Sequence, residues 1–146
     1  MDVIDVTLVA DTSIYANNDV LAVPLAVPGF LRASDDVRKI TSIVVLDEAA
    51  NGTAIDLVFL NADATLGTIN GVVSITDADA RKILGIVQVA AADYSDLIGS
   101  KLATKRDVNL IVKAASPGTT LWIGAIVRSG TPTYAASSLK LKIGVE

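Results

Sequence analysis

Apolar and polar residues alternate most clearly near the carboxyl end of the chain. Leu139, Leu141 and Ile143 fall on one side of an extended backbone, while Lys140 and Lys142 fall on the other. Successive side chains of a β-strand point to opposite faces, so this pattern predicts a strand with one buried face.

Shorter runs of β-branched and other aliphatic residues recur along the rest of the chain. They predict strands at 3–10, 20–27, 39–46, 54–60, 86–91, 108–114 and 119–127. Within 119–127 both faces are apolar, because Leu121 and Ile123 share one face while Trp122 and Ile126 share the other. A strand of this kind is expected in a sandwich, with one face inside and the other against a neighbour.

Turn residues indicate how some of these strands connect. Ser116-Pro117-Gly118 predicts a hairpin between 108–114 and 119–127, and Asn51-Gly52 predicts a second hairpin between 39–46 and 54–60. Pro24 and Pro28 each remove a backbone donor, so 20–27 is expected at a sheet edge or within an extended arm covering 11–39.

One segment departs from the strand pattern. Ser74 to Gly85 has a hydroxyl residue suited to capping, early acids, later bases and a closing glycine, which predicts a short helix or turn near 76–84. Many short strands separated by turn residues favour an all-β sandwich, and we favour a jelly-roll-like topology over an immunoglobulin one. At 146 residues, the chain 1–146 is expected to form a single β domain.

Composition narrows the classes of partner. The chain is 51% hydrophobic but only 4% aromatic, and this surplus of aliphatic residues is expected to cover a partner subunit, the alternative being a full core with many surface alanines. A net charge of −4 argues against nucleic acid as a partner, since affinity for phosphates comes from clustered Lys and Arg.

The longest apolar run, Val20 to Leu31, is interrupted by prolines and is too short to span a membrane. The acidic start of the chain does not resemble a secretory signal, so synthesis in the cytoplasm is expected.

The residue types also limit the possible chemistry. The chain has no histidine and no cysteine, which excludes Ser-His-Asp and Cys-His catalysis and the common zinc sites. No phosphate-binding glycine loop occurs. The pairs Asp77 with Asp79 and Asp93 with Asp96 are better explained as helix-start and turn residues than as catalytic or metal-binding carboxylates. We therefore expect a protein that is not an enzyme and has no cofactor.

Short sequence segments along nearly the whole chain resemble those of a group of small virion proteins of tailed bacteriophages and prophages. The segments that resemble these proteins are 10–21, 42–47, 55–60, 74–77, 82–85, 92–94, 110–116 and 130–134. The resemblance implies a jelly-roll-like capsid decoration, or cement, protein that binds the major capsid protein on the outer surface of the virion. As a separate hypothesis, we expect several copies to associate by symmetry into a structural homo-oligomer, a dimer or trimer. Two alternatives remain: another virion component, such as a head fibre or tail part, and a jelly-roll carbohydrate-binding module using Trp122, Tyr94 or Tyr134.

Interface residues are expected among the aromatic side chains and in the 11–39 segment. Tyr and Trp are enriched among the residues that dominate binding energy, although Trp122 could equally belong to the core. Prolines in 11–39 would lower the entropic cost of docking, and a basic residue there could steer an acidic partner. The interface candidates are Tyr15, Pro24, Pro28, Phe30, Arg32, Trp122 and Tyr134.

Overall fold

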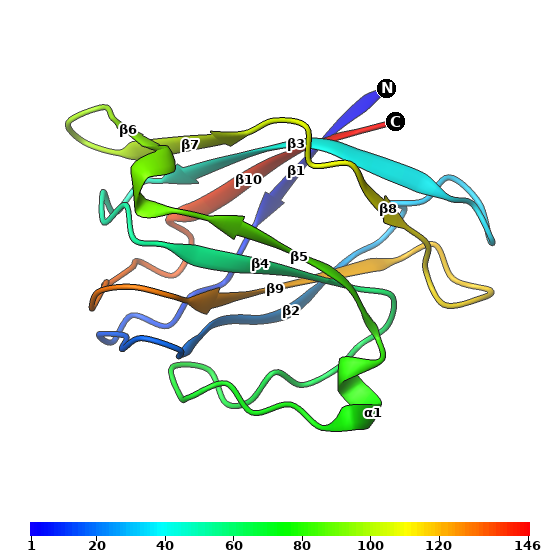
Figure 1. Cartoon of the computed structure of the whole chain (residues 1–146), viewed down its shortest axis with the longest axis horizontal. Helices are drawn as coiled ribbons and strands as arrows, with labels where there is room; N and C mark the ends of the chain where they lie inside the picture. The colour runs from blue at the N-terminus through cyan, green and yellow to red at the C-terminus, as the bar shows by residue number, and fades with distance from the viewer.

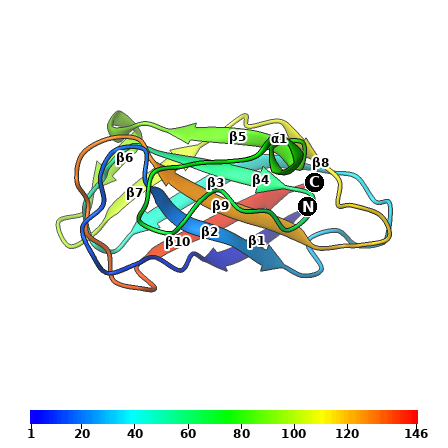
Figure 2. The same cartoon turned by 90° about the horizontal axis from the view of Figure 1, so that it is seen from below.

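A computed structural model describes residues 1–146 and has two antiparallel sheets packed face to face (Figures 1 and 2). The six-stranded sheet runs in the order β1 (Asp2–Thr7), β10 (Leu139–Val145), β3 (Arg38–Asp47), β7 (Lys101–Lys105) and β6 (Tyr94–Asp96), with β8 (Leu110–Val112) also paired to β3. The four-stranded sheet runs in the order β2 (Val20–Val27), β9 (Leu121–Val127), β4 (Ile55–Leu60) and β5 (Ile83–Val89). The predicted all-β sandwich is confirmed.

The strand order is that of a jelly roll. Pairing is nested: β1 pairs with β10, β2 with β9, β3 with β7 and β4 with β5, so that strands early in the chain meet strands late in it. Consecutive strands from β1 to β4 therefore alternate between the two sheets. A ribbon of paired strands wrapped around a barrel axis gives this arrangement, which is one way for antiparallel proteins to limit exposed edges.

Both predicted hairpins are wrong. β3 and β4 flank Asn51-Gly52 but lie in different sheets, and β8 pairs with β3 while β9 pairs with β2 and β4. The connection after β3 is instead organised by Asp47, whose buried carboxylate accepts hydrogen bonds from the backbone N–H groups of Ala49, Asn51 and Gly52 at 2.9 to 3.0 Å. The turn residues do mark changes of chain direction, but after each of them the chain crosses to the other sheet instead of returning beside the same strand.

The core lies between the sheets. Side chains from both inner faces, such as Ile43 and Leu141 from one sheet and Leu57 and Ile123 from the other, belong to one cluster of 28 buried residues. Aliphatic side chains that alternate inward along each strand fill this layer.

The predicted helix exists but is shorter than expected. Helix α1 spans Asp77–Ala80, and the hydroxyl of Thr76 caps it by accepting a hydrogen bond from the Asp79 backbone N–H at 3.2 Å. The chain then extends into β5 at Ile83, so the glycine expected to close the helix, Gly85, lies inside a strand.

The connection from β4 to β5, residues 61–82, folds across the outer face of the four-stranded sheet (Figure 2). Leu66 from this connection joins Val58, Leu60 and Ile126 from the outer face in a second buried cluster. Gly124 in β9 makes room for it, since a Cβ at that position would lie 2.7 Å from a methyl carbon of Leu66. This cover explains why β9 is apolar on both sides.

The segment 11–39 belongs to the sandwich and is not a free arm. Its strand, β2, is an edge strand of the four-stranded sheet. This position was one of the two alternatives predicted for 20–27. Leu21 and Leu31 are buried in the main cluster. Arg38, only 4% exposed, bonds the Phe30 carbonyl at 2.9 Å and the Asp2 carboxylate at 2.5 Å. The segment therefore contributes part of the core and one strand of the four-stranded sheet.

Candidate interaction surface

The outer faces of the two sheets are unlike each other. The face of the four-stranded sheet is covered by residues 61–82, whereas no connection of similar length folds across β1, β10 and β3 on the outer side of the six-stranded sheet (Figure 1). We refer to the outward side chains of these strands and of β7 as the open face. The open face is a sheet surface that the chain leaves available to a partner.

The strand register determines which residues lie on the open face. One row across the sheet contains Thr7, Lys140, Leu46 and Leu102, and the next row contains Asp5, Lys142, Val44 and Thr104. Val44, Leu46 and Leu102 are neighbours in these rows and remain half-buried. They form an apolar stripe in a shallow hollow of about 400 Å³, which is also lined by Asp5, Thr7 and both lysines.

Charged pairs border the apolar stripe. Lys142 lies 2.9 Å from the Asp5 carboxylate, with 62% and 73% of their side chains exposed, and Lys140 pairs with Glu48. Exposed pairs of this kind contribute little to folding stability. At an interface they can steer association and set the register of the partner, so the open face combines an apolar centre with a charged rim.

Sequence reasoning did not identify Val44, Leu46 or Leu102 as interface residues. The available signal was the run Ile43-Val44-Val45-Leu46, which is apolar at both odd and even positions. The same signal predicted a neighbour for β9, where the chain itself supplies the cover.

Three of the predicted interface residues belong to the core, which corrects their assignment. Tyr15 and Tyr134 are 1% and 2% exposed, and their rings meet edge to face with centroids 6.0 Å apart. The Tyr15 hydroxyl donates to the Leu21 carbonyl and accepts from the Asp11 backbone N–H, both at 2.7 Å. Phe30 is fully buried. Their apolar surface is already used within the chain, so none of them can anchor a partner.

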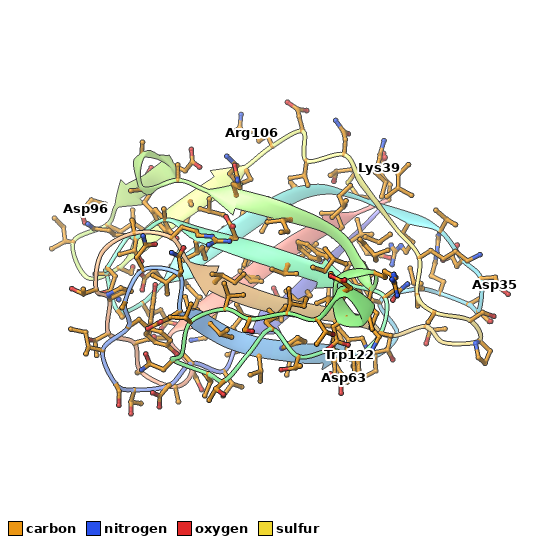
Figure 3. The ribbon with its side chains drawn as sticks, turned by 60° about the horizontal axis from the view of Figure 1, so that its bottom comes forward. Asp35, Lys39, Asp63, Asp96, Arg106 and Trp122 are labelled. Atoms are coloured by element: carbon orange, nitrogen blue, oxygen red, sulfur yellow. The ribbon has the colours of Figure 1, made fainter.

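The other four candidates reach the surface. The register of β2 and β9 places Ala26 opposite Trp122, so Pro24 and Pro28 lie two residues to either side of that pair. Pro24 and Pro28 lie along and just after the edge strand β2, and Arg32 is exposed and paired with Asp36 at 3.4 Å. Trp122 is half-buried against the second cluster on the outer side of the four-stranded sheet, near the connection that carries Asp63 (Figure 3). The expectation that these four residues contact a partner stays a prediction.

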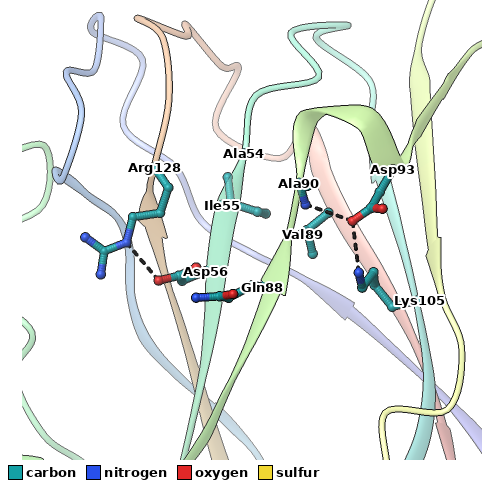
Figure 4. Close-up of a pocket in the computed structure, with 9 residues that line it drawn as sticks. All are labelled: Ala54, Ile55, Asp56, Gln88, Val89, Ala90, Asp93, Lys105 and Arg128. Atoms are coloured by element: carbon teal, nitrogen blue, oxygen red, sulfur yellow. Dashed lines mark hydrogen bonds and ion pairs between the residues drawn. The ribbon is translucent and has the colours of Figure 1, made fainter.

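A groove of about 480 Å³, lined by both charged and apolar residues, lies beside the ends of β4, β5 and β9 (Figure 4). Two ion pairs line it: Arg128 with Asp56 at 2.8 Å and Lys105 with Asp93 at 3.0 Å. The hydrogen bond from Lys105, with one from the Ala90 backbone N–H, lowers the pKa of Asp93. Each carboxylate thus already has a cation as partner, which suits a structural role better than acid catalysis.

Asp79 and Asp96, one from each of the two acid pairs considered in the sequence, also have local partners. Asp79 accepts hydrogen bonds from Lys82 at 3.0 Å and from the Thr65 backbone N–H at 3.3 Å, and these lower its pKa. Asp96 accepts from the Ile98 backbone N–H at 2.9 Å in the turn after β6. No group of three or more acidic, histidine or cysteine side chains is arranged to hold a metal ion. No helix is long and apolar enough to cross a membrane.

Comparison with known proteins adds no family to this picture. A scan against models of protein families gave no match, and a search of curated protein sequences gave none either.

Proposed function

We propose that this jelly roll is a bacteriophage capsid decoration protein that binds the outer surface of the major capsid protein lattice and stabilises the head. The observation that carries the proposal is the open face, a broad sheet surface with an apolar stripe that no other part of the chain covers. The resemblance of the sequence to small virion proteins supplies the identity of the partner. A mechanical role also agrees with carboxylates that are paired with cations or capped by backbone N–H groups.

In this proposal the open face lies against the shell. Val44, Leu46 and Leu102 supply the apolar contact, and the charged pairs at the rim fix its orientation. A specific interface of ordinary size buries about 1,200 to 2,000 Å². A contact of that size across the seam between capsid subunits would oppose their separation under the pressure of packaged DNA.

Co-sedimentation with empty expanded shells of the cognate major capsid protein tests the proposal. We expect saturable binding at a fixed ratio to capsid subunits. Val44→Lys, which places a charge within the apolar stripe, should weaken binding at least tenfold. Ile86→Lys is the matched control, because Ile86 is also a partly exposed apolar residue in a strand but lies on the other sheet. Absence of binding by the folded wild-type protein would reject the proposal, and equal loss in both variants would reject the open face as the contact.

The second candidate function is carbohydrate binding, and the groove of Figure 4 is the feature that favours it. Its lining of acidic, basic and amide side chains offers hydrogen-bonding groups for sugar hydroxyls. However, no aromatic residue lines the groove, and Tyr134 is buried, so the ring-stacking surface expected of such modules is missing there. Glycan-array binding that Asp56→Ala abolishes would favour this candidate over decoration.

A further inference from the structure

The four sheet edges differ in how well they are protected against pairing with another strand. Edge strand β2 contains Pro24 and two register shifts, β5 contains Gly85 and one shift, and β6 has only three residues. Strand β1 differs from all of these: its six residues pair with β10 in unbroken register, and it contains no proline, glycine or lysine. Natural edge strands normally carry such features because an unprotected edge recruits further strands.

The backbone of β1 is oriented to accept a further strand. The Leu8 and Ala10 N–H groups point toward the β10 side, where they donate to the carbonyls of Leu139 and Ala136 at 3.0 Å. Hydrogen-bonding direction alternates along a strand. The backbone groups of Val3, Asp5, Thr7 and Val9 therefore point away from the sheet, and β1 pairs with no strand other than β10.

The side chains along this edge are also poorly covered. Val3 and Val9 are 67% and 56% exposed, although both are apolar. An interface that covered both valines would remove apolar surface from water.

We propose that β1 pairs antiparallel with β1 of a second copy of this chain, which joins two six-stranded sheets across a two-fold axis. Residues whose backbone groups point outward must face one another, so odd positions pair with odd positions. The register with Asp5 opposite Asp5 of the second copy brings like charges together and is disfavoured. The register with Val6 on the axis places Val3 opposite Val9 and Asp5 opposite Thr7, so it covers both valines and separates the acids.

This pairing closes on itself, because the two-fold axis uses the β1 edge of each copy and leaves no β1 edge free. An edge-to-edge contact buries less surface than a face-to-face interface, so we expect a dissociation constant on the order of micromolar. The inference does not depend on capsid binding and is tested with the protein alone.

Sedimentation velocity over a wide concentration range, with proline and serine variants of Asp5, tests the pairing. Asp5→Pro removes an N–H group that points away from the sheet, and an edge strand tolerates proline at such a position. This variant should weaken dimerisation at least tenfold. Asp5→Ser loses the same exposed ion pair with Lys142 but keeps the N–H, and should dimerise like the wild type. A wild-type protein that stays monomeric at all concentrations, or equal loss in both variants, overturns the proposal.

Disulfide cross-linking tests the register without relying on a proline variant. The chain has no cysteine, and facing residues of an antiparallel pair have Cα atoms about 5.5 Å apart, within the range a disulfide spans. The double variant V3C/V9C should form a covalent dimer under mild oxidation, and V3C alone should not. Efficient cross-linking of V3C alone would overturn the proposed register.

Discussion

At the scale of single residues, the buried carboxylate of Asp47 has a large predicted effect on stability. This carboxylate accepts three backbone N–H groups in the connection that carries the chain from one sheet to the other. Asp47→Ala leaves these donors without their acceptor, and we expect the free energy of unfolding to fall by about 3 kcal/mol. Chemical denaturation measures this change.

The neighbouring carboxylate provides the control for this prediction. Glu48 pairs with Lys140, and the two side chains are 42% and 43% exposed, so Glu48→Ala should change the unfolding free energy by less than about 1 kcal/mol. Similar losses in the two variants would mean that Asp47 does not organise the connection.

Gly124 and Leu66 form a coupled pair. Gly124→Ala would place a Cβ 2.7 Å from Leu66 and 3.3 Å from the Ala22 carbonyl oxygen, and overpacking of this kind typically costs 1 to 3 kcal/mol. Truncation of Leu66 would relieve the first contact. In a double-mutant cycle we therefore expect Gly124→Ala to cost less in the Leu66→Ala background than in the wild type, and strict additivity would contradict this contact.

At the scale of elements, the connection 61–82 covers the outer face of the four-stranded sheet. Trp122 packs against the same cluster as Leu66, so the loss of this cover should change tryptophan fluorescence. Leu66→Ala should lower stability by about 2 to 4 kcal/mol and shift tryptophan emission to longer wavelength, because water gains access to the indole. Ile86→Ala, on the outer side of β5 and already 46% exposed, should leave the emission unchanged. No shift in the Leu66 variant would mean that the connection does not shield Trp122.

Much of the element pattern could be predicted from the sequence, but the pairing of strands could not. Aliphatic runs located β2 and β9 well, and alternation located β10 well, because the inward positions of these strands are aliphatic. Strand β7, Lys-Leu-Ala-Thr-Lys, has little apolar character and was not among the predicted strands. Turn residues report a local reversal and carry no information about which sheet the next strand joins, so both hairpins were wrong. Aromatic type alone likewise could not separate the buried Tyr15 and Tyr134 from the half-exposed Trp122.

At the scale of the whole molecule, the titratable groups predict how stability depends on pH. Without histidine, no side chain of ordinary pKa titrates between pH 6 and 8, so the unfolding free energy should be nearly constant there. Asp2, Asp79 and Asp93 have lowered pKa values, mainly through hydrogen bonds from Arg38, Lys82 and Lys105. Their stabilising effect is present above the unfolded pKa of about 4 and is lost as pH falls through the folded values.

The alkaline limit has the opposite sign. Burial raises the pKa values of Tyr15, Tyr94 and Tyr134, so the neutral phenols stabilise the fold below the unfolded pKa of about 10, and this contribution is lost as pH rises further. Urea unfolding between pH 2.5 and 11 should therefore give a plateau with losses on both sides. A maximum near pH 6.5, typical of a titrating imidazole, would contradict this assignment.

The nested order of the strands has a consequence for biogenesis. Within one chain β1 pairs only with β10, which follows it by more than 130 residues, and β10 also separates β1 from β3. Contacts between such distant positions slow folding. On the ribosome, the six-stranded sheet cannot be completed until residues 139–145 have left the exit tunnel. Nascent chains therefore expose β1 without its partner until β10 emerges, and crowded polysomes are where this protein is most vulnerable to misassembly.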